Sequence, residues 1–148
     1  MTGDAVAPDR QDPPSEGAYV VAGVAMPHSL DLLHDLLEQV GHQHPDVSVE
    51  DLWMLETAVI EIAGNLIEHG RPAGAVDYQL RVKVLPDRLE GLLADSGEAL
   101  PGPVTGREMP DQLAEDGRGL LLAEAVLDEL SYQRTDSANT WRMVRNRR

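Results

Sequence analysis

Cysteine and phenylalanine are both absent from the 148 residues. Without thiols the chain has no disulfides, no thiolate metal site and no cysteine nucleophile, which is compatible with a reducing compartment. Only two tryptophans and three tyrosines are present, so a core has to be built from leucine, valine, isoleucine and alanine. Lys83 is the only lysine among twelve basic residues.

Basic charge is also scarce, and the formal net charge is -14 at pH 7. An acidic body of this kind repels a phosphate backbone, so we expect no direct nucleic-acid partner. Its one basic cluster, Arg145 to Arg148, is predicted to be a solvated tail. A phosphate ligand would need Mg²⁺ and backbone amides to offset the negative field of the protein.

No apolar run approaches the roughly 20 residues of a membrane span, and the N-terminus has no apolar core typical of a secretory signal. We therefore expect a cytoplasmic protein with no membrane partner. The length and the 42% hydrophobic content predict one domain. Residues 1–17 are rich in proline and acid and are predicted to be a disordered tail, which leaves 18–146 for the fold.

Apolar periodicity predicts five strands and three helices, in the order strand, helix, long helix, hairpin, helix, hairpin. The predicted ranges are 19–26, 30–40, 48–70, 76–84 with 88–94, 117–130, and 131–134 with 140–144. Hairpins whose helices gather on one face predict a two-layer α+β sandwich. We expect a mixed, mostly antiparallel sheet that is covered on one face by three helices.

Helix ends and loops can also be predicted from the residues between these elements. Ser29 and Asp116 are predicted to cap helices, and Gly41 to end one. His42 and His44 are predicted to be exposed loop residues, because a metal site would need a third ligand nearby. Residues 96–116 are rich in glycine and proline, which is typical of a lid or binding loop, or of disorder.

The central helix carries the first candidate site. Glu61 and Asn65 are four residues apart and therefore project from the same side of the helix. The carbonyl oxygen of Asn65 suits Mg²⁺, and Glu61 can accept a proton from a hydroxyl or water that attacks a phosphate. The alternative is an ordinary solvated helix face.

Two glycine-containing motifs follow. Asp95 and Gly97 stand at a strand end, where a carboxylate can accept a hydrogen bond from an exocyclic amine such as that of adenine, although ordinary turn chemistry explains them too. Gly117, Arg118 and Gly119 begin a helix, where free backbone amides and one positive charge can meet phosphate oxygens. Packing alone is the alternative explanation for these glycines.

The three motifs together resemble the GHKL (Bergerat-fold) ATPase superfamily, and most closely its anti-sigma-factor serine/threonine protein kinase branch. The resemblance extends from about Tyr19 to Val144. It rests on a Glu-x-x-x-Asn motif with a following His-Gly, an Asp-x-Gly box, a Gly-x-Gly-Leu box and a threonine that enters the last strand. The matching residues are Glu61, Asn65, His69, Gly70, Asp95, Gly97, Gly117, Gly119, Leu120 and Thr140.

The resemblance implies a role for each motif. Glu61 would be the general base, Asn65 the Mg²⁺ ligand and Asp95 the residue that recognises adenine, with Thr140 close to it. Gly117, Arg118 and Gly119 would hold the phosphates of ATP beneath the lid. The implied partners are a sigma factor and an antagonist protein that carries the target Ser or Thr, and the chain would be a homodimer.

Three functions remain open from the sequence. The first is a kinase that uses ATP and Mg²⁺ to phosphorylate the antagonist and so controls capture of the sigma factor. The second is a nucleotide-binding module that acts by sequestration with little or no turnover. The third is an α+β interaction domain without nucleotide, which would require all three motifs to be coincidental.

Overall fold

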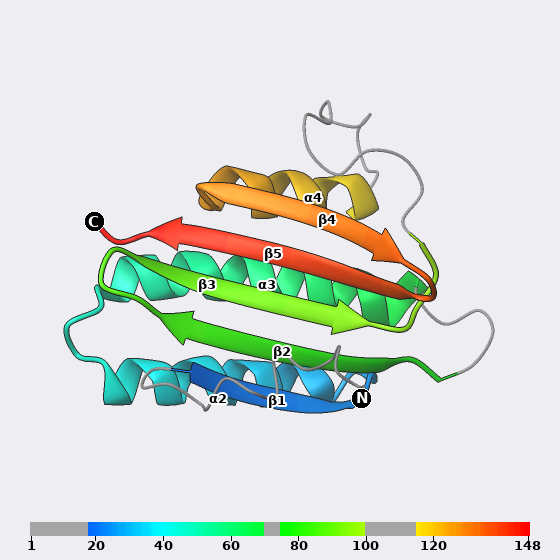
Figure 1. The fold of residues 1–148 in the computed structure, drawn as a ribbon, viewed down its shortest axis with the longest axis horizontal. Helices are drawn as coiled ribbons and strands as arrows, with labels where there is room; N and C mark the ends of the chain where they lie inside the picture. Colours follow the sequence, from blue (N-terminus) through cyan, green and yellow to red (C-terminus); the bar gives the residue numbers. More distant parts are fainter. Residues whose placement is uncertain (1–17, 70–74, 100–114) are drawn as a thin grey trace, which may run out of the picture.

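The computed structural model describes residues 18–69, 75–99 and 115–148. It contains a five-stranded sheet with the order β1-β2-β3-β5-β4, and the three helices lie behind this sheet in Figure 1. The elements are β1 (Ala18–Val24), α2 (Ser29–Gln43), α3 (Val49–His69), β2 (Asp77–Val84), β3 (Arg88–Asp95), α4 (Glu115–Val126), β4 (Glu129–Thr135) and β5 (Ala138–Asn146).

The predicted α+β sandwich is confirmed, and the order of its elements is the predicted one. All four strand pairings in the described residues are antiparallel, so the parallel component of the expected mixed sheet is not seen there. The hydrophobic core lies between the sheet and α3. Leu55, Val59 and Ile62 of α3 are at most 1% exposed. Burying side chains of this size stabilises the fold by about 1.5–3 kcal/mol each.

Helix α2 is longer than predicted. It continues through Gly41 and His42 to Gln43, because Gly41 does not end the helix but lies against α3. A Cβ at Gly41 would stand 2.9 Å from Cδ2 of Leu52, so the missing side chain permits the close approach of the two helices. His44 follows the helix, and its Nε2 lies 2.9 Å from the hydroxyl oxygen of Tyr19. The prediction of two exposed loop histidines is therefore right only in part: His42 is exposed but lies in the helix, and His44 lies in the loop but is half-buried.

The helix caps also differ in part. Ser48 accepts a hydrogen bond from the backbone N of Asp51 at 3.0 Å and caps α3. Ser29 does not cap α2 but is its first residue, and its hydroxyl donates to the carbonyl of Val24. Helix α4 begins at Glu115, so Asp116 lies inside its first turn. Leu130, expected in this helix, lies on β4.

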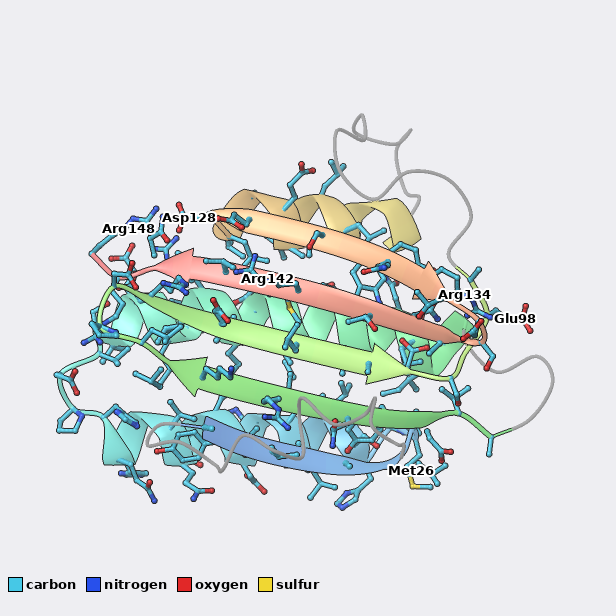
Figure 2. The ribbon with its side chains drawn as sticks, in the orientation of Figure 1. Met26, Glu98, Asp128, Arg134, Arg142 and Arg148 are labelled. Carbon is cyan, nitrogen blue, oxygen red and sulfur yellow. The ribbon has the colours of Figure 1, made fainter. Side chains whose placement is uncertain are left out.

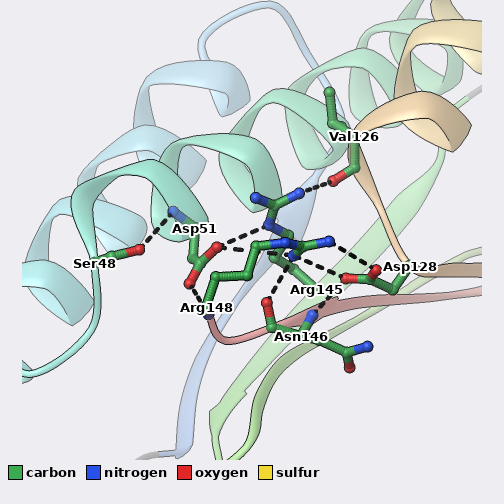
Figure 3. A network of polar contacts seen from close by, with 7 residues as sticks. All are labelled: Ser48, Asp51, Val126, Asp128, Arg145, Asn146 and Arg148. Atoms are coloured by element: carbon green, nitrogen blue, oxygen red, sulfur yellow. Dashed lines mark hydrogen bonds and ion pairs between the residues drawn. The ribbon is translucent and has the colours of Figure 1, made fainter.

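The C-terminal arginines do not form the predicted solvated tail. Arg145 is 7% exposed, and its Nε donates to Oδ1 of Asp51, which is 1% exposed, at 3.0 Å. Figure 3 shows how this pair joins the beginning of α3 to the end of β5, with Arg148 bridging to Asp128. Buried charges occur only where they are paired, so this cluster belongs to the fold.

The pKa of Asp51 reflects two opposed effects. Burial raises this pKa, but hydrogen bonds from the backbone N–H of Arg148, from Ser48 and from Arg145 outweigh burial and leave the pKa below its ordinary value. The carboxylate is therefore ionised at neutral pH.

Three predicted segments lie outside the described residues: the tail at 1–17, the loop after α3, and residues 100–114 of the expected lid. Within the described ranges, no helix is long and apolar enough to cross a membrane.

Candidate functional site

Helix α3 positions the first pair of site residues. Ile62 and Leu66 face the core, and the intervening turns leave Glu61 and Asn65 only partly covered. The two polar side chains are one helical turn apart and can address the same space. An acid and an amide are thereby fixed on a helix whose opposite face is anchored in the core.

Helix α4 brings the third motif to this pair. A Cβ at Gly119 would stand 2.9 Å from Oε1 of Glu61 and 3.8 Å from Nδ2 of Asn65. Any larger residue at position 119 would make the Glu61 carboxylate shift, because a Cβ does not approach another atom this closely. Gly119 is 54 residues from Asn65 in the sequence. The beginning of α4 and the Glu61–Asn65 pair of α3 nevertheless form one site.

The second motif lies at the end of β3. Asp95 is 5% exposed, and its Oδ1 accepts hydrogen bonds at 2.8 Å from the backbone N of Gly97 and from Nδ2 of Asn139. Gly97 is buried at the bend that follows the strand. The end of β3, the C-terminal end of α3 and the beginning of α4 lie at the same end of the molecule in Figure 1.

The structure pairs Asn139, and not Thr140, with Asp95. In the β3–β5 register Asp95 is opposite Asn139, while Thr140 is opposite Ala94. Successive residues of a strand point to opposite faces, so Thr140 faces away from the Asp95 side of the sheet. We therefore correct the expected position of Thr140 and assign its place to Asn139, which the sequence analysis missed.

Asn139 is itself held by the β4 strand. Its Oδ1 accepts hydrogen bonds from the hydroxyl of Tyr132 and, at 3.1 Å, from Nη1 of Arg134. Arg134 also donates to the carbonyl of Gly97 at 2.6 Å. Figure 2 shows Arg134 and Glu98 at the same end of the sheet. A cross-strand polar network thus surrounds the Asp95 carboxylate.

For three of the remaining predicted residues, the structure describes only the position in a helix. His69 is the last residue of α3, and Gly117 and Arg118 lie in the first turns of α4, but their side chains are outside the described part of the structure. Leu120 is 1% exposed and belongs to the core, where it packs α4 onto the rest of the fold. In the described residues, no group of three or more His, Asp or Glu could hold a metal ion.

Comparison with known proteins identifies the class. A family model described as a histidine kinase-like ATPase domain matches residues 24–145. The chain therefore belongs to the histidine kinase-like ATPase family, and the GHKL resemblance is confirmed.

Its relatives place it more narrowly. The chain is 32% identical to the serine-protein kinase RsbW of Bacillus licheniformis over 122 residues, which cover 76% of this chain and 72% of that protein. It is 31% identical to RsbW of Bacillus subtilis (strain 168) over 68% of this chain and 66% of that protein. These matches confirm that the resemblance is to the anti-sigma-factor kinase branch.

A solved structure shares the fold. The crystal structure of the RsbU and RsbW domains of a Mycobacterium tuberculosis protein matches with a TM-score of 0.63 and 14% identity. The match covers 90% of this chain and only 33% of that one, so this chain spans about a third of its length.

Proposed function

We propose that this chain is an ATP-dependent serine/threonine protein kinase that phosphorylates an anti-sigma-factor antagonist and sequesters a sigma factor. The contact of Gly119 with Glu61 and Asn65 carries this proposal, because it joins two separate nucleotide-binding motifs into one site. Family membership and the serine-protein kinase relatives support it.

The residues fit ATP with Mg²⁺. Asn65 would supply a carbonyl oxygen to the metal, and phosphate oxygens and water would complete the shell, since Mg²⁺ needs few protein ligands. Mg²⁺ would neutralise phosphate charge that the acidic body cannot offset. Backbone N–H groups at Gly117 and Gly119 and the charge of Arg118 would hold the phosphates.

The base end of ATP would lie at Asp95. Oδ1 of this carboxylate is occupied by Gly97 N and Asn139 Nδ2, so Oδ2 would accept the adenine amino group. The resemblance assigns His69, Gly97 and Leu120 to the same nucleotide site, Leu120 by packing rather than by polar contact.

In the transfer step the Ser or Thr hydroxyl oxygen of the antagonist would attack the γ-phosphorus of ATP. Glu61 would take the hydroxyl proton as general base, the bond from the γ-phosphorus to the bridging oxygen would break, and ADP would leave. The products would be the phosphorylated antagonist and ADP. We further propose that the chain acts as a homodimer in the cytoplasm.

The test measures binding and transfer separately. Calorimetry with ATP at millimolar Mg²⁺ should detect binding, and γ-labelled ATP should label the antagonist protein. Glu61→Ala should keep ATP binding and lower transfer by about 100- to 10,000-fold. Glu50→Ala is the matched control, because Glu50 is an exposed acid at the other end of α3.

Each outcome decides between the functions. No ATP binding by the unaltered protein would exclude both the kinase and the nucleotide-binding module. Binding without any labelled antagonist would favour the module that acts by sequestration. Unchanged transfer by Glu61→Ala would remove Glu61 from the role of general base.

A further inference from the structure

The outward side of α3 carries an exposed apolar stripe. Val49 and Trp53, one helical turn apart, are 83% and 65% exposed. Ile60 and Gly64 continue the stripe along the helix, and a Cβ at Gly64 would meet nothing within 4 Å. Single exposed apolar residues are common on protein surfaces, whereas several that are aligned on one helix face are typical of a contact surface.

Trp53 is the largest side chain of this stripe. The other tryptophan, Trp141, is 5% exposed and packs against the ring of Tyr132, so it belongs to the fold. Thr57 lies one turn after Trp53, and its hydroxyl donates to the Trp53 carbonyl at 2.9 Å, which keeps that hydroxyl inside the helix. Tryptophan offers a large apolar area for burial and is enriched among the residues that dominate binding energy. Trp53 is therefore the expected anchor of a contact here.

The side of the stripe that faces α2 is acidic. Neither α2 nor α3 contains a lysine or an arginine. Asp35 and Glu38 are exposed on α2, and His34 of the same helix pairs with Glu56 of α3. The hydrogen bond with Glu56 and the negative charges of Glu56, Glu38 and Asp35 raise the pKa of His34, so the field of these acids extends to the α2–α3 contact. Such a surface attracts a positively charged partner.

This chain does not supply that charge from its C-terminal end. Arg147 and Arg148 already pair with Asp46 and Asp128, at 2.7 and 3.0 Å. A second copy is also a poor occupant, because a two-fold contact through this stripe would place the acids of α2 against one another. The occupant favoured by charge is a basic segment of a different protein.

The backbone of α3 determines what form this segment takes. The backbone N–H and C=O groups inside a helix bond to one another, so only side chains of α3 are available to a partner. A segment that buries its own backbone against an apolar stripe has to satisfy its polar groups internally, as an α-helix does.

We propose that the stripe of Val49, Trp53, Ile60 and Gly64 docks a basic amphipathic helix of a partner protein, with Trp53 as the anchor. Aliphatic side chains of the partner cover the stripe, and its arginines or lysines lie between Trp53 and the acids of α2. A guanidinium group over the indole ring adds cation–π attraction. The surface is separate from the proposed nucleotide site, because Trp53 precedes Asn65 by 12 residues, or about 18 Å along the helix.

Calorimetry with a synthetic peptide tests this surface. The peptide has about 18 residues, with leucine and arginine at helical spacing. We expect it to bind the unaltered protein and to bind Trp53→Ala about tenfold more weakly, or worse. Val49→Ala should also weaken binding, whereas Val20→Ala, the same change at a 47% exposed position on β1, should not. ATP binding should be the same in all four proteins.

The charge and the occupant are tested by the outcomes. A peptide with glutamate in place of arginine should not bind, and equal binding of both peptides would overturn the proposal. Equal affinity of the arginine peptide for the unaltered protein and Trp53→Ala would mean that the net charge of -14 alone attracts it, which also overturns the proposal. So would no binding of the arginine peptide at all.

Sedimentation of the unaltered protein and of Trp53→Ala tests the second copy as occupant. A dimer that is lost in this variant would assign the stripe to contact between copies and would overturn the proposal. If Trp53→Ala lacks a cooperative melting transition, the pair Val49→Ala and Val20→Ala decides instead, because Val49 is the more exposed of the two. Equal peptide affinity in that pair would then refute the docking surface.

Discussion

The buried polar side chains of this molecule differ in whether they have hydrogen-bond partners. Asp51, Asp95, Asn139 and Arg145 are all at most 7% exposed, and each has partners. Tyr78 is 5% exposed, and its hydroxyl has no partner in the described part of the chain. A buried polar group without a partner costs about 1–3 kcal/mol, whereas a paired one contributes to stability. The consequences of removing each group are therefore opposite in sign.

Tyr78→Phe removes the hydroxyl that has no partner. We expect the free energy of unfolding to stay the same or to rise by about 1 kcal/mol, because the ring contacts remain and a desolvated polar atom is lost. Urea unfolding at pH 7 measures the change. A destabilisation of about 1 kcal/mol or more would show that the hydroxyl has a partner in solution, such as a bound water.

Asp51→Asn breaks a buried ion pair. Arg145 would keep its charge in a site where it is 7% exposed, and leaving such a charge without its counter-ion costs about 3–5 kcal/mol. Asp128→Asn is the control, since Asp128 is 24% exposed where it meets Arg148, and pairs with solvent contact are worth at most about 1 kcal/mol. Equal losses for both variants in urea unfolding would refute the distinction.

At the scale of elements, the sequence predicts the type and order of the helices and strands better than their ends. Alternation of apolar residues in β2 and β3 predicts a half-buried hairpin, and the structure has it from Asp77 to Asp95. Gly41 suggested a helix end, but glycine also permits close helix approach, and only the packing of α3 shows which of the two applies. The sequence around Gly41 cannot predict its contact with α3, because Leu52 lies in another helix.

The expected position of Thr140 near Asp95 was also wrong because of where an element begins. The predicted strands 131–134 and 140–144 leave residues 135–139 for the turn, but β4 and β5 pair from Thr135 and Ala138, which leaves two residues for it. Asp136, with φ of 49°, makes this tight turn possible. Because a shift of one residue exchanges the faces of a strand, Asn139 reaches Asp95 and Thr140 does not.

The contact between α3 and α4 leads to a prediction at this scale. Gly119→Ala should displace the Glu61 carboxylate, because the added Cβ would stand 2.9 Å from Oε1. If Glu61 is the general base, as proposed, a displacement of about 1 Å costs up to roughly 100-fold, so transfer should fall by about 10- to 100-fold while ATP binding changes less. Leu122→Ala on the same helix is the control for activity, since Leu122 is 42% exposed.

Gly64→Ala separates this effect from helix propensity. Gly64 lies inside α3, and an added Cβ would meet nothing within 4 Å. Alanine should therefore raise the free energy of unfolding by about 0.5–1 kcal/mol. Stabilisation by Gly64→Ala together with loss of transfer in Gly119→Ala would show that the second effect is steric. Equal transfer by Gly119→Ala and the unaltered protein would contradict the contact.

For the molecule as a whole, acid and base are unevenly balanced, with 26 Asp and Glu against 12 Lys and Arg. The arginines of the C-terminal end nevertheless have carboxylate partners. Hydrogen bonds from Arg147 and Arg148 lower the pKa of Asp46 and of Asp128, respectively. Burial raises the pKa of Glu90, but contacts with Arg88 and Arg142 outweigh it, so that pKa is lowered as well.

These shifts determine how stability depends on pH. A carboxylate with a lowered pKa in the folded state stabilises the fold above its unfolded pKa, 3.8 for Asp and 4.5 for Glu, and this contribution is lost as the pH falls further. His34 has the opposite sign. Its hydrogen bond with Glu56 raises its pKa above 6.5, so its contribution is present below pH 6.5 and is lost as the pH rises.

We therefore expect the free energy of unfolding to be greatest at about pH 5 to 6, where the paired carboxylates are ionised and His34 is protonated. Partial neutralisation of the net charge of -14 reduces self-repulsion in the same range. Urea unfolding from about pH 3 to 8 measures the profile. Asp51→Asn should reduce the fall of the free energy of unfolding toward acid pH, because it removes one titrating carboxylate. His34→Gln should reduce the fall toward neutral pH, because it removes one titrating imidazole. Stability that keeps rising down to about pH 3 would mean that relief of self-repulsion outweighs the loss of the arginine–carboxylate pairs.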